Sequence, residues 1–234
     1  MKGETFGLTR DYLKSGGLAA FIREKNPDVQ LLTDAERAEN LAAILAGRPD
    51  RGLGLWVFAY GSLIWNPAIH ITQRRLARAH GWHRSYCLAT KGGRGTADNP
   101  GMMLGLEAGE TCVGAVLHVD EAAIDEELDI LWRREMVASG YIPRWVAFDT
   151  VDDEPTLSSH AIAFTINPDG PSYCPPMPEP DLVRRLATAR GELGTASDYL
   201  FNTRDGLRSL GIRDPMLESL GDQVAEIQAT FTNG

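Results

Sequence analysis

Six short segments rich in β-forming residues occupy the stretch between residues 55 and 166, and they constrain the fold more than any other feature. The first is continuously apolar, as expected of a buried strand, and several others alternate apolar and polar residues. Only one stretch of helical periodicity interrupts them. The pattern predicts an α+β fold, in which mostly antiparallel strands form a small barrel with flanking helices. The predicted strands lie within residues 55–60, 77–90, 102–107, 111–119, 144–151 and 160–166.

Helical patterns lie before, between and after these strands. Thr33 and Glu36 have the spacing of a capping box, and the helix that they begin is expected to end near Gly47. Residues 120–136 form a second helix, for which Asp120 is the expected cap. Apolar residues at 182, 186, 189 and 193 predict a helix through all four positions, and Asp214-Pro215 begins another. We expect a helical N-terminal extension, residues 1–50, and a main domain, residues 51–234.

Composition excludes several classes of protein. Apolar residues make up 43% and charged residues 24%, as in ordinary globular chains. The longest apolar runs are far shorter than the roughly 20 residues of a membrane-spanning helix, and no secretory signal is apparent. Three widely spaced cysteines favour free thiols in a reducing compartment, and the net charge of −9 argues against nucleic-acid binding. We therefore expect a cytoplasmic protein that binds neither membranes nor nucleic acid.

Charge is unevenly distributed along the chain. Residues 51–97 contain no Asp or Glu but carry seven cations. Two interpretations remain open: the cations form a locally positive site for an anionic small molecule, or they pair with acidic segments elsewhere in the fold. The cations are Arg51, Arg74, Arg75, Arg78, Arg84, Lys91 and Arg94.

Tyr60-Gly61-Ser62-Leu63 follows the first predicted strand directly. A glycine with positive φ would let the chain turn sharply there, so that successive backbone N–H groups stay unpaired and form a nest for an anion. Ser62 would add a hydroxyl group. The alternative is an ordinary turn at the end of a strand.

Glu135 lies where the helical pattern asks for an apolar residue. It follows Ile124 by 11 positions, which returns it to the buried side defined by Ile124, Leu128 and Leu131. Burial raises the pKa of a carboxyl group toward values useful for proton transfer. Two alternatives remain open. The helix ends before Glu135, or Glu135 pairs with one of the arginines Arg84, Arg133 and Arg144.

Other kinds of catalytic site find no support. The G-x-S-x-G pattern of a nucleophilic serine is absent. His80 and His83 would face opposite sides of a strand and have no cysteine nearby, so no metal site is expected.

Three segments together resemble the ChaC-type γ-glutamylcyclotransferases. VFAYGSLIWNP (57–67) looks like the family's opening strand and glycine loop, and WRREMVASGYIPRW (132–145) resembles the segment that carries its catalytic glutamate. DYLFNTRDGLRSLGIRDPMLESL (198–220) is similar to its C-terminal helical region. Ala59 departs from the glycine of eukaryotic members, and the stretch after Glu135 looks more like that of bacterial members.

The resemblance implies a γ-glutamylcyclotransferase-like fold, a small mixed β-barrel with flanking helices. It also implies a glutathione-specific γ-glutamylcyclotransferase without a cofactor. Such an enzyme converts glutathione into 5-oxoproline and Cys-Gly through attack by the substrate's own α-amine. Glu135 matches the family's acid/base. The substrate-binding positions matched by the resemblance are Tyr60, Gly61, Ser62, Leu63, Tyr141 and Tyr199.

Two other functions remain open: a non-catalytic sensor of γ-glutamyl metabolites or regulator of transport, and a cyclotransferase for other γ-glutamyl amines. Glu135 favours turnover, because a sensor has no use for a group that transfers protons.

Overall fold

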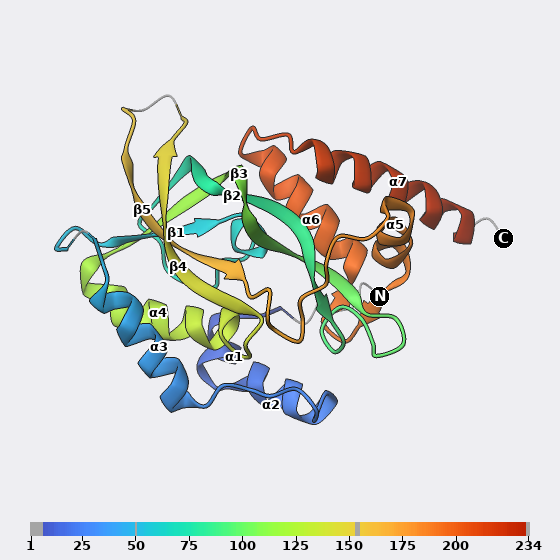
Figure 1. Ribbon diagram of the computed structural model, residues 1–234, viewed down its shortest axis with the longest axis horizontal. Helices are drawn as coiled ribbons and strands as arrows, with labels where there is room; N and C mark the ends of the chain where they lie inside the picture. The colour runs from blue at the N-terminus through green and yellow to red at the C-terminus, as the bar shows by residue number, and fades with distance from the viewer. Residues whose placement is uncertain (1–6, 50, 153–154, 233–234) are drawn as a thin grey trace. The chain divides into compact units, whose positions relative to one another are not determined.

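The computed structural model describes residues 7–49, 51–152 and 155–232, which are drawn in colour in Figure 1. Their contacts divide the chain into two compact units. The first consists of Leu8–Ser85 and Gly105–Pro171. The second contains Tyr86–Leu104 and the chain from Ser172 onward. The predicted boundary near residue 50 stays a prediction about domain organisation.

A closed five-stranded barrel lies mainly in the first unit, with strand order β1-β3-β2-β4-β5. The pairs β1–β3, β2–β4 and β4–β5 are antiparallel and β1–β5 is parallel, so the barrel is mixed, as the family resemblance implied. Buried apolar side chains such as Val57, Leu117 and Ile162 form its core. The strands are β1 (Leu55–Ala59), β2 (Gln73–Thr90), β3 (Gly101–Val119), β4 (Tyr141–Thr150) and β5 (Ser158–Ile166).

The prediction of separate strands at 102–107 and 111–119 is wrong, because both belong to the single strand β3. Residues 108–111 in its middle are exposed. Exposed positions do not require apolar side chains, although the backbone stays extended through them. The β-strand pattern in the sequence is therefore interrupted at these residues, whereas the strand itself continues.

Helix α4 (Ile124–Glu135) connects β3 to β4 and follows a short 3₁₀ turn, η2 (Glu121–Ala123), which is capped by Asp120. Three N-terminal helices belong to the same unit: α1 (Arg10–Lys14), α2 (Gly17–Lys25) and α3 (Asp34–Ala46). Each of them contacts α4, and α3 also contacts β4. Figure 1 shows α3 and α1 beside α4. The helix that ends in Glu135 is thus covered by the segment predicted as an extension.

Helix α3 begins with the predicted capping box. The Thr33 hydroxyl accepts a hydrogen bond from the Glu36 N–H at 3.2 Å, and the Glu36 carboxylate accepts one from the Thr33 N–H at 2.7 Å. Gly47 ends the helix as expected.

Replacing Thr33 with Ala removes the acceptor for an N–H group at the start of α3. We expect the free energy of unfolding to fall by about 1 kcal/mol, the usual loss for such a cap. Chemical denaturation measures the change. The Thr33→Ser variant keeps the hydroxyl and serves as the control, so an Ala variant as stable as the Ser variant would contradict this role of Thr33.

The second unit contains three helices, α5 (Glu179–Thr188), α6 (Ala196–Ser209) and α7 (Pro215–Thr232), which pack on one another. Asp214 caps α7, and Pro215 is its first residue, as predicted. The prediction that one helix continues through 189 and 193 is wrong. Helix α5 ends at Thr188 and is followed by the short strands β6 (Arg190–Gly191) and β7 (Gly194–Thr195). A side chain at Gly191 would meet the Gly93 carbonyl at 2.4 Å, so close backbone packing replaces the helix here.

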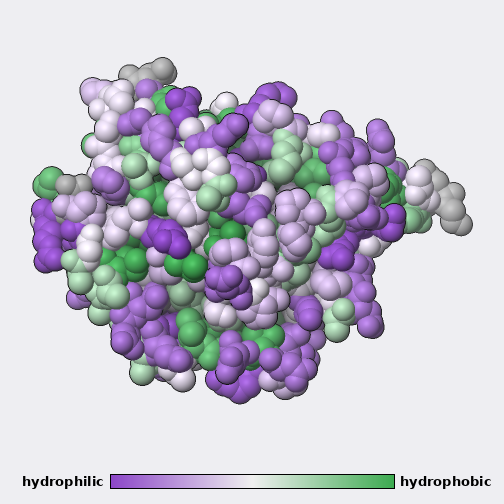
Figure 2. All heavy atoms as spheres, viewed as in Figure 1, coloured by the Kyte–Doolittle hydropathy of each residue, from purple (hydrophilic) through white to green (hydrophobic). Residues whose placement is uncertain are grey.

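Most large apolar side chains are buried. On the face shown in Figure 2, hydrophobic residues occur as small patches between hydrophilic ones. Leu53 and Phe231 are the most exposed of the large apolar residues that the structure describes. None of the described helices combines the length and the apolar character needed to cross a membrane.

Candidate active site

The chain turns sharply directly after β1. Ser62–Ile64 form a 3₁₀ turn, η1, in which the Ile64 N–H donates to the Gly61 carbonyl at 3.0 Å. The N–H groups of Ser62 and Leu63 precede that first hydrogen bond, and they therefore have no acceptor within the turn. The sharp turn predicted after the first strand is present, and the anion-binding nest stays a prediction.

The predicted conformation of Gly61 is wrong in one respect. Its φ is −137° and its ψ −128°, so it does not adopt positive φ. The turn is made by the 3₁₀ conformation of the following residues instead. Any requirement for a small residue at position 61 therefore comes from the position of Gly61 at the turn and not from a positive φ.

Tyr60 is fixed to the barrel at both ends of the residue. Its hydroxyl donates to the Phe164 carbonyl in β5 at 2.7 Å, and its own carbonyl accepts from the Arg84 Nε at 2.7 Å. Arg84 also donates to the Val113 carbonyl at 2.8 Å. Tyr60 is 6% exposed, so it supports the turn from within the core. Among the cations of residues 51–97, Arg84 thus lies at this turn. Arg75 instead pairs with Asp152, and Arg94 belongs to the second unit.

Glu135 is the last residue of α4. The buried side of this helix is formed by Ile124, Leu128 and Leu131, as the periodicity predicted. The Glu135 side chain is 13% exposed. Burial raises the pKa of its carboxyl group above the ordinary value, and the charge and hydrogen bonding of Arg134 oppose that rise only in part. The helix therefore does not end before Glu135, and it presents a carboxyl group of increased basicity.

The ion-pair partner of Glu135 is Arg134, whose Nε lies 2.8 Å from Oε1. The three arginines proposed from the sequence are wrong as partners: Arg84 binds the carbonyls named above, Arg133 pairs with Asp129, and Arg144 lies over the Trp82 ring. Among the described residues no donor is aligned to form a hydrogen bond with Oε1, although this atom is buried. At Oε1 the contact with Arg134 is therefore mainly electrostatic, and it offsets only part of the rise in the pKa that burial causes.

Arg134 connects Glu135 to the turn. Its guanidinium donates to the Ser62 hydroxyl at 2.8 Å and to the Asn66 carbonyl, in addition to the ion pair. Sequence reasoning missed this residue. A signal was present, because Glu127, Ile130 and Arg134 follow one another at +3 and +4 and are all buried on one side of α4.

The remaining predicted residues are Tyr141, Tyr199 and Leu63. Tyr141 is the first residue of β4, is half-buried and pairs in register with Ile166 of β5. Tyr199 belongs to the second unit, where it is 2% exposed in α6 and the Arg94 guanidinium lies 5.6 Å from its ring centre. Leu63 is buried within η1.

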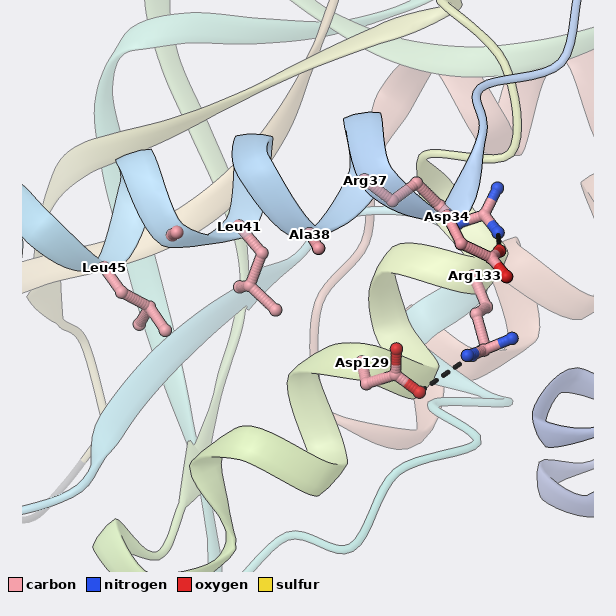
Figure 3. A pocket seen from close by; sticks show the side chains of 8 residues that line it. Asp34, Arg37, Ala38, Leu41, Leu45, Asp129 and Arg133 are labelled. Atoms are coloured by element: carbon pink, nitrogen blue, oxygen red, sulfur yellow. Dashed lines mark hydrogen bonds and ion pairs between the residues drawn. The ribbon is translucent and has the colours of Figure 1, made fainter.

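A pocket of about 230 Å³ lies elsewhere in the first unit, between α3 and α4 (Figure 3). Figure 3 shows Leu41 and Leu45 along α3, and Arg133 pointing toward Asp129. None of the predicted site residues lines it. The consecutive residues Arg133 and Arg134 thus have different surroundings. Arg133 lines this pocket, and Arg134 contacts the turn. The lining residues are Asp34, Arg37, Ala38, Leu41, Ala42, Leu45, Asp129 and Arg133.

Comparison with known families decides the relationship. The ChaC-like protein family matches residues 55–227, from the first strand of the barrel into α7. The chain belongs to the ChaC-like family. The match includes the turn after β1 and the end of α4, and hence every residue predicted for the site.

Curated relatives extend the similarity beyond those residues. The glutathione-specific γ-glutamylcyclotransferase of Escherichia coli (strain K12) is 40% identical over 97% of this chain and 96% of its own length. The γ-glutamylcyclotransferase 2-3 of Arabidopsis thaliana is 30% identical over 75% of this chain and 90% of its own. A crystal structure of a glutathione-specific γ-glutamyl cyclotransferase from yeast aligns with a TM-score of 0.68, at 20% identity over 75% of this chain and 97% of that one. The ChaC-like chain thus has the γ-glutamylcyclotransferase fold.

Proposed function

We propose that this chain is a glutathione-specific γ-glutamylcyclotransferase in which Glu135 is the acid/base. The E. coli relative with that name aligns along nearly the whole chain, which supports the activity. The observation that carries the assignment of Glu135 is its own environment. It is a largely buried carboxyl group of raised pKa, joined through Arg134 to the turn after β1.

The reaction requires one group that moves protons. The substrate's α-amine attacks the δ-carbonyl of its own γ-glutamyl group, and an ammonium cannot do so. Glu135 removes the proton from the ammonium and later gives a proton to the leaving amide nitrogen, which departs as the amine of Cys-Gly. A raised pKa suits both steps, because the carboxyl group must accept and release a proton near the working pH. Binding the substrate's γ-glutamyl group in the conformation in which its amine can reach the carbonyl supplies much of the remaining rate enhancement.

The turn supplies hydrogen-bond donors. The N–H groups of Ser62 and Leu63 have no acceptor within η1, and they would bind the α-carboxylate or polarise the carbonyl oxygen. The Ser62 hydroxyl accepts from Arg134 and therefore still has its own proton to donate. Tyr60 would support the turn, and Gly61 would admit the substrate close to the backbone. The roles of Tyr141 and Tyr199 in substrate binding stay predictions from the family resemblance.

The proposal includes a cytoplasmic setting, where reduced glutathione is available. All three cysteines are free thiols in the structure, which is compatible with a reducing compartment. Among the described residues, no three His, Cys, Asp or Glu side chains gather closely enough to hold a metal ion.

Incubation with reduced glutathione should yield 5-oxoproline and Cys-Gly in equal amounts. The mechanism uses an intramolecular nucleophile and a carboxyl group, so we expect the rate to be unchanged by EDTA. Chromatographic detection of 5-oxoproline measures both results. γ-Glutamyl-alanine serves as the comparison substrate: its turnover without that of glutathione would contradict the specificity, and the absence of 5-oxoproline from both would favour the sensor.

A further inference from the structure

We propose that Arg134 is the positioning residue of this site, holding the Glu135 carboxylate and the turn after β1 in one fixed arrangement. This inference rests on the proposed function of Glu135. It adds a residue for which the family resemblance assigned no role.

All three nitrogens of the Arg134 guanidinium are engaged. Nε lies 2.8 Å from Glu135 Oε1, one terminal nitrogen donates to the Ser62 hydroxyl at 2.8 Å, and the other donates to the Asn66 carbonyl. The residue is 7% exposed. One rigid, planar group therefore connects the end of α4 with both ends of the turn.

The chemistry of arginine suits this task. Its donors form a fixed fork, and fixing one of them also fixes the direction of the others. A lysine carries the same charge as a single point on a flexible stem, and it cannot reach three partners in these directions. Because Ser62 belongs to the turn that would bind substrate, loss of the fork would change the position of Glu135 relative to the substrate.

Arg134 is also the charge that acts on Glu135. Burial raises the pKa of Glu135 and Arg134 opposes the rise, so removal of the positive charge should raise that pKa further. Several charged groups near α4 form ion pairs of their own, while Asp11, Arg23 and Glu39 are exposed. Those pairs are Arg10 with Glu127, Lys14 with Glu126, Lys25 with Glu24, Arg37 with Asp34, and Arg48 with Glu121, while Arg84 binds backbone carbonyls.

Two variants separate the positioning effect of Arg134 from the effect of its positive charge. In Arg134→Met both are lost, so we expect kcat to fall about 100-fold or more and the acidic limb of the pH–rate profile to move up by about one pH unit. In Arg134→Lys the charge remains, so the acidic limb should stay close to that of the wild type while kcat still falls at least about tenfold. A merely structural role would lower the melting temperature and leave the limb in place.

Arg133→Met is the matched control, because Arg133 is the neighbouring residue of the same helix but pairs with Asp129 at the α3–α4 pocket. It should keep wild-type kcat and pH dependence. Wild-type kcat in Arg134→Lys would overturn the proposal, and so would an unmoved acidic limb in a folded Arg134→Met variant.

A measurement that needs no turnover keeps this inference distinct from the proposed function. Titration of the Glu135 carboxyl group by ¹³C NMR, assigned by its absence in Glu135→Gln, should give a higher midpoint in Arg134→Met than in the wild type. That result holds even if the wild type makes no 5-oxoproline, which would refute the proposed function alone. Equal midpoints would refute the role of Arg134 even in an active enzyme.

Discussion

The Glu135→Gln variant should lose at least 100-fold in kcat while it still binds glutathione. Glutamine keeps the size of the side chain and a hydrogen-bonding group, but it cannot accept the proton of the substrate ammonium. General acid–base groups typically contribute about 10²–10⁴ in rate, which sets the expected size of the loss. The rate of 5-oxoproline formation gives kcat, and isothermal titration calorimetry gives the affinity for glutathione.

Stability should change little in this variant at neutral pH, because two effects oppose each other. Removal of a buried carboxylate is favourable, whereas Arg134 loses its ion pair but keeps its bonds to Ser62 and Asn66. Since the pKa of Glu135 is raised on folding, the wild type loses stability as the pH rises above the ordinary value of 4.5, and the Gln variant does not. The stability of Gln relative to wild type should therefore increase with pH.

Glu126→Gln is the control on the same helix, because Glu126 is exposed and pairs with Lys14 at 2.8 Å. Its kcat should stay within about twofold of the wild type, as for most exposed substitutions. Near-wild-type turnover by Glu135→Gln would refute the mechanism. A large drop in its melting temperature with full activity would assign Glu135 to anchoring Arg134 only.

Arg10→Met should lower the free energy of unfolding by about 3–5 kcal/mol, the range for a buried ion pair that loses one partner. The Glu127 side chain is 2% exposed, and both its oxygens accept from the Arg10 guanidinium, one at 2.9 Å. Its carboxylate also accepts from the His70 N–H at 2.9 Å. Without Arg10 the buried carboxylate would keep only the His70 N–H and the exposed His70 ring, whose Nδ1 lies 3.3 Å from Oε1. Chemical denaturation at pH 7 measures the loss.

The effect should depend on pH. Burial raises the pKa of Glu127, but the hydrogen bonds and charge interactions of Arg10 and His70 together outweigh burial, and the pKa lies below its ordinary value. The stability that the pair contributes is therefore present above about pH 4.5 and is lost as the pH falls through the lowered pKa. The difference between wild type and Arg10→Met should shrink as the pH falls below the ordinary value of 4.5.

Lys14→Met is the matched control for Arg10→Met. Lys14 belongs to the same helix and pairs with the neighbouring Glu126, but both side chains are about half exposed. Exposed pairs contribute little, so we expect a loss below about 1 kcal/mol. An equal effect of the two substitutions would show that burial of Glu127 does not matter, and would refute the argument.

Local patterns in the sequence predicted most elements of the fold. The capping box of α3, the first turn of α7 and the buried side of α4 depend on residues within one or two turns of each other, so the sequence contains the whole interaction. The errors lie where distant segments decide. Helix α5 stops at Thr188, and Gly191 beyond it packs against the backbone of Gly93, a contact that no local period reveals.

The site divides in the same way. The sequence by itself determined the chemical groups: a sharp turn after the first strand, a carboxylic acid on the buried side of a helix, and the family to which they belong. Only the tertiary structure decided the electrostatic partners. Several arginines were compatible with Glu135, and the fold selected Arg134, because an ion pair depends on distances between side chains that spacing along the chain does not determine. For the same reason Arg10, far away in sequence, became the partner of the buried Glu127.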